Sequence, residues 1–265
     1  MIEPASLMNA PRSTPAPASS AAAATREPHA LSPQQQVYLW LSALFVTALL
    51  VANVVGVKLF RFTIDLGGWT IPVEHTVGML AFPITFLLTD LLNEYYGTRA
   101  TRRVAYVAFA MGAAAFAMYT IARRIPIREG VPGTASADAF ENIFGAASLM
   151  YLASLGAFLV GAMLDILLFS VFKKLTKGKL VWLRATGSTV VSQLVDSFII
   201  TILFFQVAQT LTGGEAAPFS EVLKIALTGY ILKFVISVVL TPVIYLGRWV
   251  LSKWLGLTPI PAELA

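Results

Sequence analysis

Acidic and amide side chains at helical spacing within apolar sequence are the residues of this chain that could do chemistry. Between Thr89 and Gly97 the sequence carries two carboxylates and an amide. At about 100° per residue, Asp90, Asn93 and Glu94 fall on one face of a helix. In lipid, a charge at mid-helix costs about 2.5–3.5 kcal/mol on insertion scales, so it faces a partner or a cavity. This face is therefore a candidate for binding a polar ligand.

A second polar face follows Arg184. Hydroxyl residues there share about 140° of arc with Gln193 and Asp196. Close helix packing would explain the hydroxyl groups, because small and hydroxyl residues let helices approach each other, but it does not explain a carboxylate near the middle. Gln193 and Asp196 are therefore candidates to contact a ligand.

One ammonium group, Lys233, stands in the last apolar run and needs an anionic partner. Asp196, Asp165 and Asp90 are available, and we favour Asp196. The alternative to a binding role for Lys233 is a structural ion pair that holds the helices together.

Two further groups have both a binding and a structural interpretation. Asn53, in the first apolar run, either contacts a ligand or joins two helices. Glu94 either faces a ligand or marks the cytoplasmic boundary of its helix, where Arg99 or Arg102 would pair with it.

The elements that must hold these groups are membrane helices. Of 265 residues, 57% are hydrophobic and only 12% are charged, with a mean hydropathy of +0.75, whereas a soluble domain is about 25% charged. Apolar runs of about 20 residues recur, and each is long enough to cross a bilayer. The runs are continuous rather than alternating, which excludes a transmembrane barrel. The sequence predicts an all-α polytopic membrane protein.

The spacing of the apolar runs predicts a six-helix transmembrane bundle. The expected spans lie at about 38–60, 75–95, 103–122, 148–172, 185–212 and 222–250. Residues 1–36, rich in Ala, Pro and Ser, are expected to form a disordered tail. The transmembrane domain then covers 37–256, and 257–265 form a short C-terminal tail. Three spans on each side of the connector 123–145 suggest two inverted three-helix repeats.

The distribution of basic residues predicts the orientation. Twelve of the 19 Lys and Arg residues fall on the side that holds the N-terminus, and six fall on the other side. Excess Lys and Arg marks cytoplasmic loops, so both termini are expected in the cytoplasm together with the loop 173–184. The connector 123–145, which contains three arginines, argues against this orientation.

Several classes of chemistry are excluded or disfavoured. The chain has no cysteine, which excludes disulfides and thiol catalysis. His29 stands in the tail and His75 at the end of a span, so we expect no metal site and no catalytic histidine. No nucleotide-binding motif is present, and we expect no cofactor. The net charge of +5 reflects membrane topology, so we expect no direct contact with nucleic acid.

Three runs of the sequence resemble a known family. They are Phe82-Pro83 through Thr89–Gly97 with Arg102-Arg103 behind it, Ser192–Phe198, and Ala52-Asn53 with Lys58. Together they resemble the signatures of the bacterial queuosine precursor transporters, once called putative vitamin uptake transporters. The similarity covers about 38–250. One departure is Ser197, where the family pattern has Thr and the hydroxyl is retained.

The resemblance implies a function and a location. The chain would be a non-enzymatic importer of 7-cyano-7-deazaguanine, 7-aminomethyl-7-deazaguanine or both, for salvage into the tRNA nucleoside queuosine. It would lie in the bacterial inner membrane, with lipid and the small deazaguanine substrate as its partners. Whether the substrate moves by facilitated or proton-coupled transport, and whether the chain forms a homodimer, is left open.

The residues suit a guanine-like edge, which offers N–H donors to a carboxylate and acceptors to amide or ammonium groups. We expect Asn53, Asp90, Glu94, Gln193 and Asp196 to converge on one polar cavity between the first, second and fifth spans. Asn93 and Lys233 complete the expected substrate-binding set. Phe86, Phe198 and Tyr230 are candidates to stack on the base.

Two other functions fit the sequence. The chain could be a substrate-binding membrane subunit of a multi-component vitamin-type uptake system, with Ala48-x-x-x-Ala52 as a docking face. It could instead be an intramembrane hydrolase that uses Asp90 or Asp196, but a carboxylate dyad needs two groups that share a site.

Overall fold

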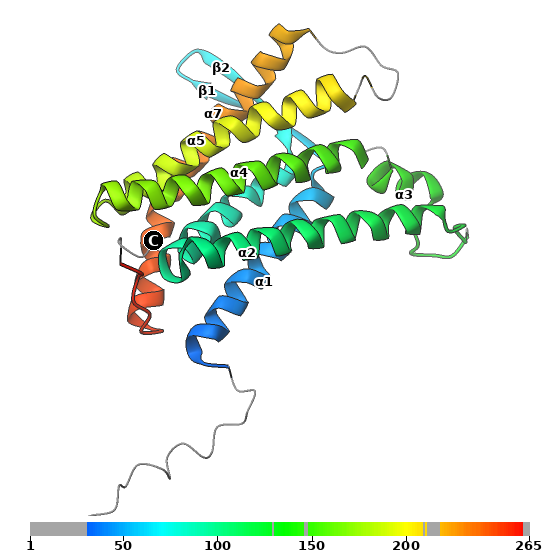
Figure 1. Cartoon of the computed structure of the whole chain (residues 1–265). Coiled ribbons are helices and arrows are strands. Elements are labelled where there is room, and N and C mark those ends of the chain that lie inside the picture. Colours follow the sequence, from blue (N-terminus) through cyan, green and yellow to red (C-terminus); the bar gives the residue numbers. More distant parts are fainter. Residues whose placement is uncertain (1–30, 129, 146–147, 209, 211–217, 262–265) are drawn as a thin grey trace, which may run out of the picture.

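A bundle of long apolar helices forms the molecule, as a computed structural model shows (Figure 1). The structure describes residues 31–128, 130–145, 148–208, 210 and 218–261. Within these residues, five helices are long and apolar enough to cross a membrane. The protein is all-α apart from one hairpin and is polytopic, as predicted.

The first helix, α1 (Pro33–Val55), begins within the predicted tail. Ser32 accepts a hydrogen bond from the Gln35 N–H, and the Gln35 side chain accepts one from the Ser32 N–H. This capping box satisfies two N–H groups at the helix start. Helix α1 therefore starts before the predicted boundary at 36, and residues 1–30 of the predicted tail lie outside the described residues.

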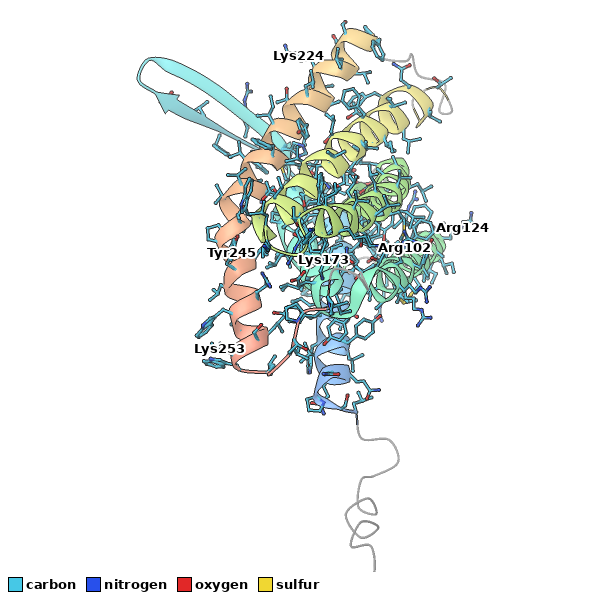
Figure 2. All side chains as sticks on the ribbon, turned by 60° about the vertical axis from the view of Figure 1, so that its left-hand side comes forward. Arg102, Arg124, Lys173, Lys224, Tyr245 and Lys253 are labelled. Atoms are coloured by element: carbon cyan, nitrogen blue, oxygen red, sulfur yellow. The ribbon has the colours of Figure 1, made fainter. Side chains whose placement is uncertain are left out.

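A two-stranded hairpin follows α1 and was not predicted. Strand β1 (Leu59–Leu66) pairs antiparallel with β2 (Trp69–Thr76), and Gly67 and Gly68 form the turn with positive φ. Figure 2 shows this hairpin projecting away from the helices. The Gly-Gly pair between two β-rich runs is a hairpin signal that the span assignment overlooked. A single 3-10 turn, η1 (Val77–Leu80), leads back into the bundle.

Helix α2 (Phe82–Arg124) contains the whole of the predicted span 103–122 and most of the span 75–95, whose first residues lie in β2 and η1 instead. They are separated by a break at Gly97, whose φ of 79° and ψ of 170° only glycine adopts readily. The described helices of membrane-spanning length are therefore five continuous elements, because two predicted spans are joined without a loop.

The two halves of α2 run in opposite directions. Before Gly97, the chain passes from η1, where Gly78 packs on Ala52 near the end of α1, to Tyr96, whose hydroxyl donates to the Gln34 carbonyl at the start of α1 (2.8 Å). After Gly97, it runs back to Arg123, which donates to Ser148 at the start of the fourth helix (3.3 Å).

The remaining helices complete the bundle. A short helix that was not predicted, α3 (Ala137–Phe144), lies in the connector. It is followed by α4 (Ser148–Leu175), α5 (Val181–Ile202), the π-helical continuation η2 (Leu203–Ala208) and α7 (Phe219–Lys253). The predicted spans 148–172 and 222–250 correspond to α4 and α7. The predicted span 185–212 corresponds to α5 and η2, except that 209, 211 and 212 lie outside the described residues.

The core lies where α1, α2 and α4 meet. Leu49, Leu92, Ala108, Leu155 and Ile166 are buried in one cluster. Many large apolar side chains point outward instead, such as Trp40, Met118 and Val239. A helix bundle that is apolar on its outside suits a lipid environment.

Candidate functional site

The Lys233 ammonium pairs with the Asp196 carboxylate, which joins α7 to α5. Both side chains are nearly buried, with 7% and 6% of their surface exposed. The ammonium also lies 5.1 Å from the centroid of the Phe82 ring, on α2. The predicted partner of Lys233 is therefore correct. At mid-bundle, a lone ammonium would be strongly disfavoured, so a carboxylate on the facing helix is the natural partner.

A cavity of about 150 Å³ adjoins this pair. Its wall comes from α1, β2, α4, α5 and α7, and its polar members include Asn53, His75, Tyr151, Ser154, Ser197 and Lys233. The apolar part of the wall includes Phe82 and Phe205. A mostly apolar cavity with a few converging polar groups is the usual construction of a small-molecule site.

The polar groups on this wall differ in what they can offer a ligand. The Ser197 hydroxyl is buried and has no partner among the described residues. His75 Nδ1 accepts a hydrogen bond from the Thr76 N–H (2.9 Å), which leaves Nε2 as the donor of a neutral imidazole. Burial, and then the charge of Lys233, lower the pKa of His75 to about 4, against a smaller effect of the Thr76 hydrogen bond. His75 is therefore neutral at pH 7.

Two smaller cavities lie next to the first one. One, of about 20 Å³, is lined by Asp90, Thr189 and Lys233. The other, of about 10 Å³, is lined by Asp165, Gln193 and Asp196. Phe82 lines all three cavities and therefore lies where they adjoin.

Each of the two smaller cavities is lined by a carboxylate, Asp90 or Asp165, that has no ion-pair partner among the described residues. Asp90 is 2% exposed, and neither of its oxygens has a hydrogen-bond partner among the described residues. Asp165 Oδ1 accepts hydrogen bonds from Ser192 (3.1 Å) and Thr189 (3.4 Å). Gln193 is also buried, and its Oε1 has no partner in the described part of the chain.

Glu94 lies outside these three cavities and is the centre of a buried ion cluster. Its carboxylate pairs with Lys173 (3.1 Å), Arg184 (2.5 Å) and Arg248 (3.1 Å). These three cations come from the end of α4, the start of α5 and the last third of α7. The expected convergence of Glu94 with the cavity residues is not observed, and its partners are not the predicted Arg99 or Arg102.

The other predicted residues take varied positions. Asn53 lines the larger cavity and donates to the Leu49 carbonyl (3.0 Å). Asn93 joins α2 to α4 by donating to the Ile166 carbonyl (3.0 Å). Phe86 lines the two smaller cavities, whereas Phe198 and Tyr230 line none of the three.

Sequence reasoning missed part of the site, although some of it was readable. Tyr151 and Ser154 share a face of α4 with Asp165. Ser154 follows Tyr151 by three residues, and Asp165 follows Ser154 by eleven. That face could have been recognised by the same helical periodicity that identified Asp196. His75 could not, because its place on the cavity wall depends on the hairpin.

Apolar helices around buried polar cavities are typical of membrane transporters. The sequence model of the family described as "Putative vitamin uptake transporter" matches residues 76–247, and the chain belongs to this family of transporters. The match includes Asp90, Asp196 and Lys233.

Relatives give a more specific likeness. The chain is 30% identical over 187 residues to a protein of Bacillus subtilis (strain 168) named "Probable queuosine precursor transporter", covering 70% of this chain and 75% of that protein. It is 25% identical over 214 residues to a protein of the same name in Haemophilus influenzae, covering 78% and 84%. It is 29% identical over 168 residues to the "Queuosine precursor transporter" of Escherichia coli (strain K12), covering 62% and 69%. No solved structure matches the chain.

Proposed function

We propose that this chain imports the free bases 7-cyano-7-deazaguanine and 7-aminomethyl-7-deazaguanine, precursors of queuosine. The relatives' names support a queuosine precursor as substrate. The observation that carries the proposal is the cavity of about 150 Å³, mostly apolar with a few polar groups, beside the buried Asp196–Lys233 pair. A cavity of this size suits a base better than a nucleoside, since an engineered cavity of about 150 Å³ holds benzene.

The polar groups of the site match the edge of a guanine-like base. In this proposal the Asp196 carboxylate accepts from the N–H edge of the base, and Lys233 donates to its carbonyl oxygen. Asn53 and Ser197 bind the remaining polar atoms. The rings of Phe82 and Tyr151, which both line the cavity, hold the base plane.

We propose that the chain lies in the inner membrane with six crossings, one for each half of α2 and one for each other long helix. Both termini are then cytoplasmic. Two observations support this arrangement: the antiparallel halves of α2, and the surplus of basic residues near Gly97.

The docking face considered for a multi-component system is not free in this structure. Ala48 and Ala52 are 8% and 5% exposed, and a Cβ on Gly78 of η1 would collide with the Ala52 carbonyl. Transport by the chain alone is therefore the function we favour.

Uptake of radiolabelled precursor into proteoliposomes that contain only this purified chain tests the proposal. We expect uptake of both deazaguanines, competition by unlabelled precursor, and loss of uptake in Asp196→Asn. Asp138→Asn, an exposed carboxylate of α3, is the matched control and should transport at the parent rate. Liposomes with the parent protein that take up no more precursor than empty liposomes would refute the proposed function.

A further inference from the structure

The Asp90 carboxyl group is buried outside the cavity that we propose for the base. It is almost fully buried, and its two oxygens have no hydrogen-bond partner among the described residues. It lines the cavity of about 20 Å³ and does not line the larger cavity proposed for the base. An ionised carboxylate without a partner in such a place is strongly disfavoured, so Asp90 carries a proton in this conformation.

In the described part of the chain, every cation near Asp90 forms an ion pair with another carboxylate. Glu94, on the same helix, has Lys173, Arg184 and Arg248 as its own partners. Besides Arg184, the ionisable group of α5 is Asp196, which forms an ion pair with Lys233 of α7.

The other titratable groups described on the helices that pack against α2 do not provide a cation for Asp90 either. On α4, Asp165 is a further carboxylate, satisfied in part by hydroxyl groups. On α7, Tyr245 lies near Arg184. Among the described residues, none of these groups forms a hydrogen bond with Asp90.

Lys233 is the cation that could reach Asp90. Its side chain lines both the cavity of Asp90 and the larger cavity, and its ammonium now pairs with Asp196. Two carboxylates on different helices therefore flank one ammonium group. The protonation of one carboxylate determines whether it competes for the ammonium.

We propose that Asp90 is the proton-coupling site of the transporter and that Lys233 exchanges between Asp196 and Asp90 as this proton leaves and returns. With Asp90 protonated, Lys233 stays on Asp196 and faces the larger cavity, which is the arrangement in this structure. When Asp90 releases its proton to water, its carboxylate attracts the ammonium out of the larger cavity. Lys233 keeps all three of its protons, and no covalent bond other than the Asp90 O–H changes.

This exchange couples the proton to the base, and the inference rests on the proposed function. The base binds to Asp196 and Lys233 together, so it binds more tightly when Asp90 is protonated. By linkage, bound base also favours protonation of Asp90. Proton and base therefore enter together, and both leave on the side of higher pH.

Proteoliposomes distinguish coupling from binding. With a pH gradient of about one unit, acidic outside, a carrier that moves one proton per base accumulates the base up to about tenfold. Asp90→Asn mimics the protonated carboxyl group. We expect it to retain exchange of labelled for unlabelled precursor at the parent rate and to reach only equal concentrations on both sides. Asp90→Glu, which can still ionise, should retain gradient-driven accumulation, and Asp138→Asn should behave as the parent.

Three results would overturn the coupling role. The first is Asp90→Asn that accumulates precursor with the gradient as the parent does. The second is a monodisperse Asp90→Asn protein that loses exchange as well, because Asp90 would then be part of the binding site or the scaffold. The third is parent protein whose uptake does not respond to the pH gradient.

Infrared absorption of the protonated carboxyl group tests the same site without transport. At neutral pH the parent protein should show a band that shifts in D₂O and is absent from Asp90→Asn. If the parent transports no precursor but shows this band, the proposed function fails while the proton site stands. A spectrum of Asp90→Asn identical to that of the parent would show that Asp90 is ionised, which contradicts the inference.

Discussion

Asp196 and Lys233 form a buried ion pair whose two members depend on each other. Removing one leaves an unpaired charge among apolar helices, which costs about 3–5 kcal/mol in buried pairs. We therefore expect Lys233→Ala and Asp196→Ala each to lower the thermal unfolding temperature of the detergent-solubilised protein strongly, and the double variant to lower it less. A double variant no more stable than either single variant would mean that the observed pair does not hold the helices together.

Glu94 is a single carboxylate that compensates three cations. Glu94→Gln keeps the shape and removes the charge, so Lys173, Arg184 and Arg248 would repel one another inside the bundle. We expect a large loss of thermal stability and of monodisperse protein. Glu141→Gln breaks the exposed pair with Arg123 and is the control that should unfold close to the parent temperature. Equal effects of the two substitutions would contradict a structural role for the Glu94 cluster.

His75 gives the protein a dependence on pH. Its pKa of about 4 in the folded protein lies below the ordinary value of 6.5 because burial and Lys233 disfavour the imidazolium. As pH falls from about 6.5 towards 4, the unfolded chain binds a proton at this histidine that the folded chain does not. The free energy of unfolding therefore decreases over this range, and the full contribution of His75 is present only above about pH 6.5. His75→Gln should flatten the fall between pH 7 and 5 in thermal unfolding. A parent protein that is equally stable at both pH values would exclude this effect.

For single residues, the sequence predicted the ion pair that a charge within lipid requires. It did not predict ion pairs between residues that are far apart in the chain. An ammonium group within an apolar helix must meet a carboxylate, which made Asp196 a sound choice for Lys233. The partners of Glu94 were not predictable, since Lys173 and Arg184 are 79 and 90 residues away and resemble loop charges. Their position at helix ends, beside a break in α2, is visible only in three dimensions.

Among the elements, α2 depends most on one residue. Gly97 has a backbone conformation that costs other residues about 1–3 kcal/mol, and a Cβ there would lie 3.2 Å from Ile260. We expect Gly97→Ala to lower the unfolding temperature and the yield of folded protein. Gly156→Ala in α4 is the control, because its Cβ would make an ordinary contact with Leu203 at 3.7 Å. Unchanged stability of Gly97→Ala would show that α2 can reverse its direction without this conformation.

The predicted elements were correct where the length of an apolar run determines a helix. They were wrong where the local backbone conformation determines the element. Spans 148–172 and 222–250 correspond to α4 and α7. The hairpin, the join at Gly97 and the π-helical end of α5 each depend on a few backbone angles that hydropathy does not register. Because β2 carries His75 to the cavity, the missed hairpin also explains the missed residue.

Across the whole molecule, the ends of several helices meet on one side. The Tyr38 hydroxyl, near the start of α1, donates to the Ala100 carbonyl (3.2 Å) just after Gly97. The Ile260 N–H, beyond α7, donates to the Glu94 carbonyl (2.9 Å). In Figure 1 the turn between the two halves of α2, the connection from α4 to α5 and the segment that follows α7 lie on the same side, and Figure 2 places Lys224 and Lys253 at opposite ends of α7.

This arrangement predicts which loops face the cytoplasm. The end of α4 and the loop that follows it contain four lysines and lie on the side of the turn within α2, whereas α3 lies at the opposite ends of α2 and α4. Because basic loops stay in the cytoplasm, an impermeant thiol reagent added to intact cells should label Asp138→Cys and spare Lys177→Cys until the cells are opened. The chain has no cysteine, so the parent protein gives no background. Labelling of Lys177→Cys with protection of Asp138→Cys would reverse the orientation, and labelling of neither or both in intact cells would mean that α4 does not separate the two sides.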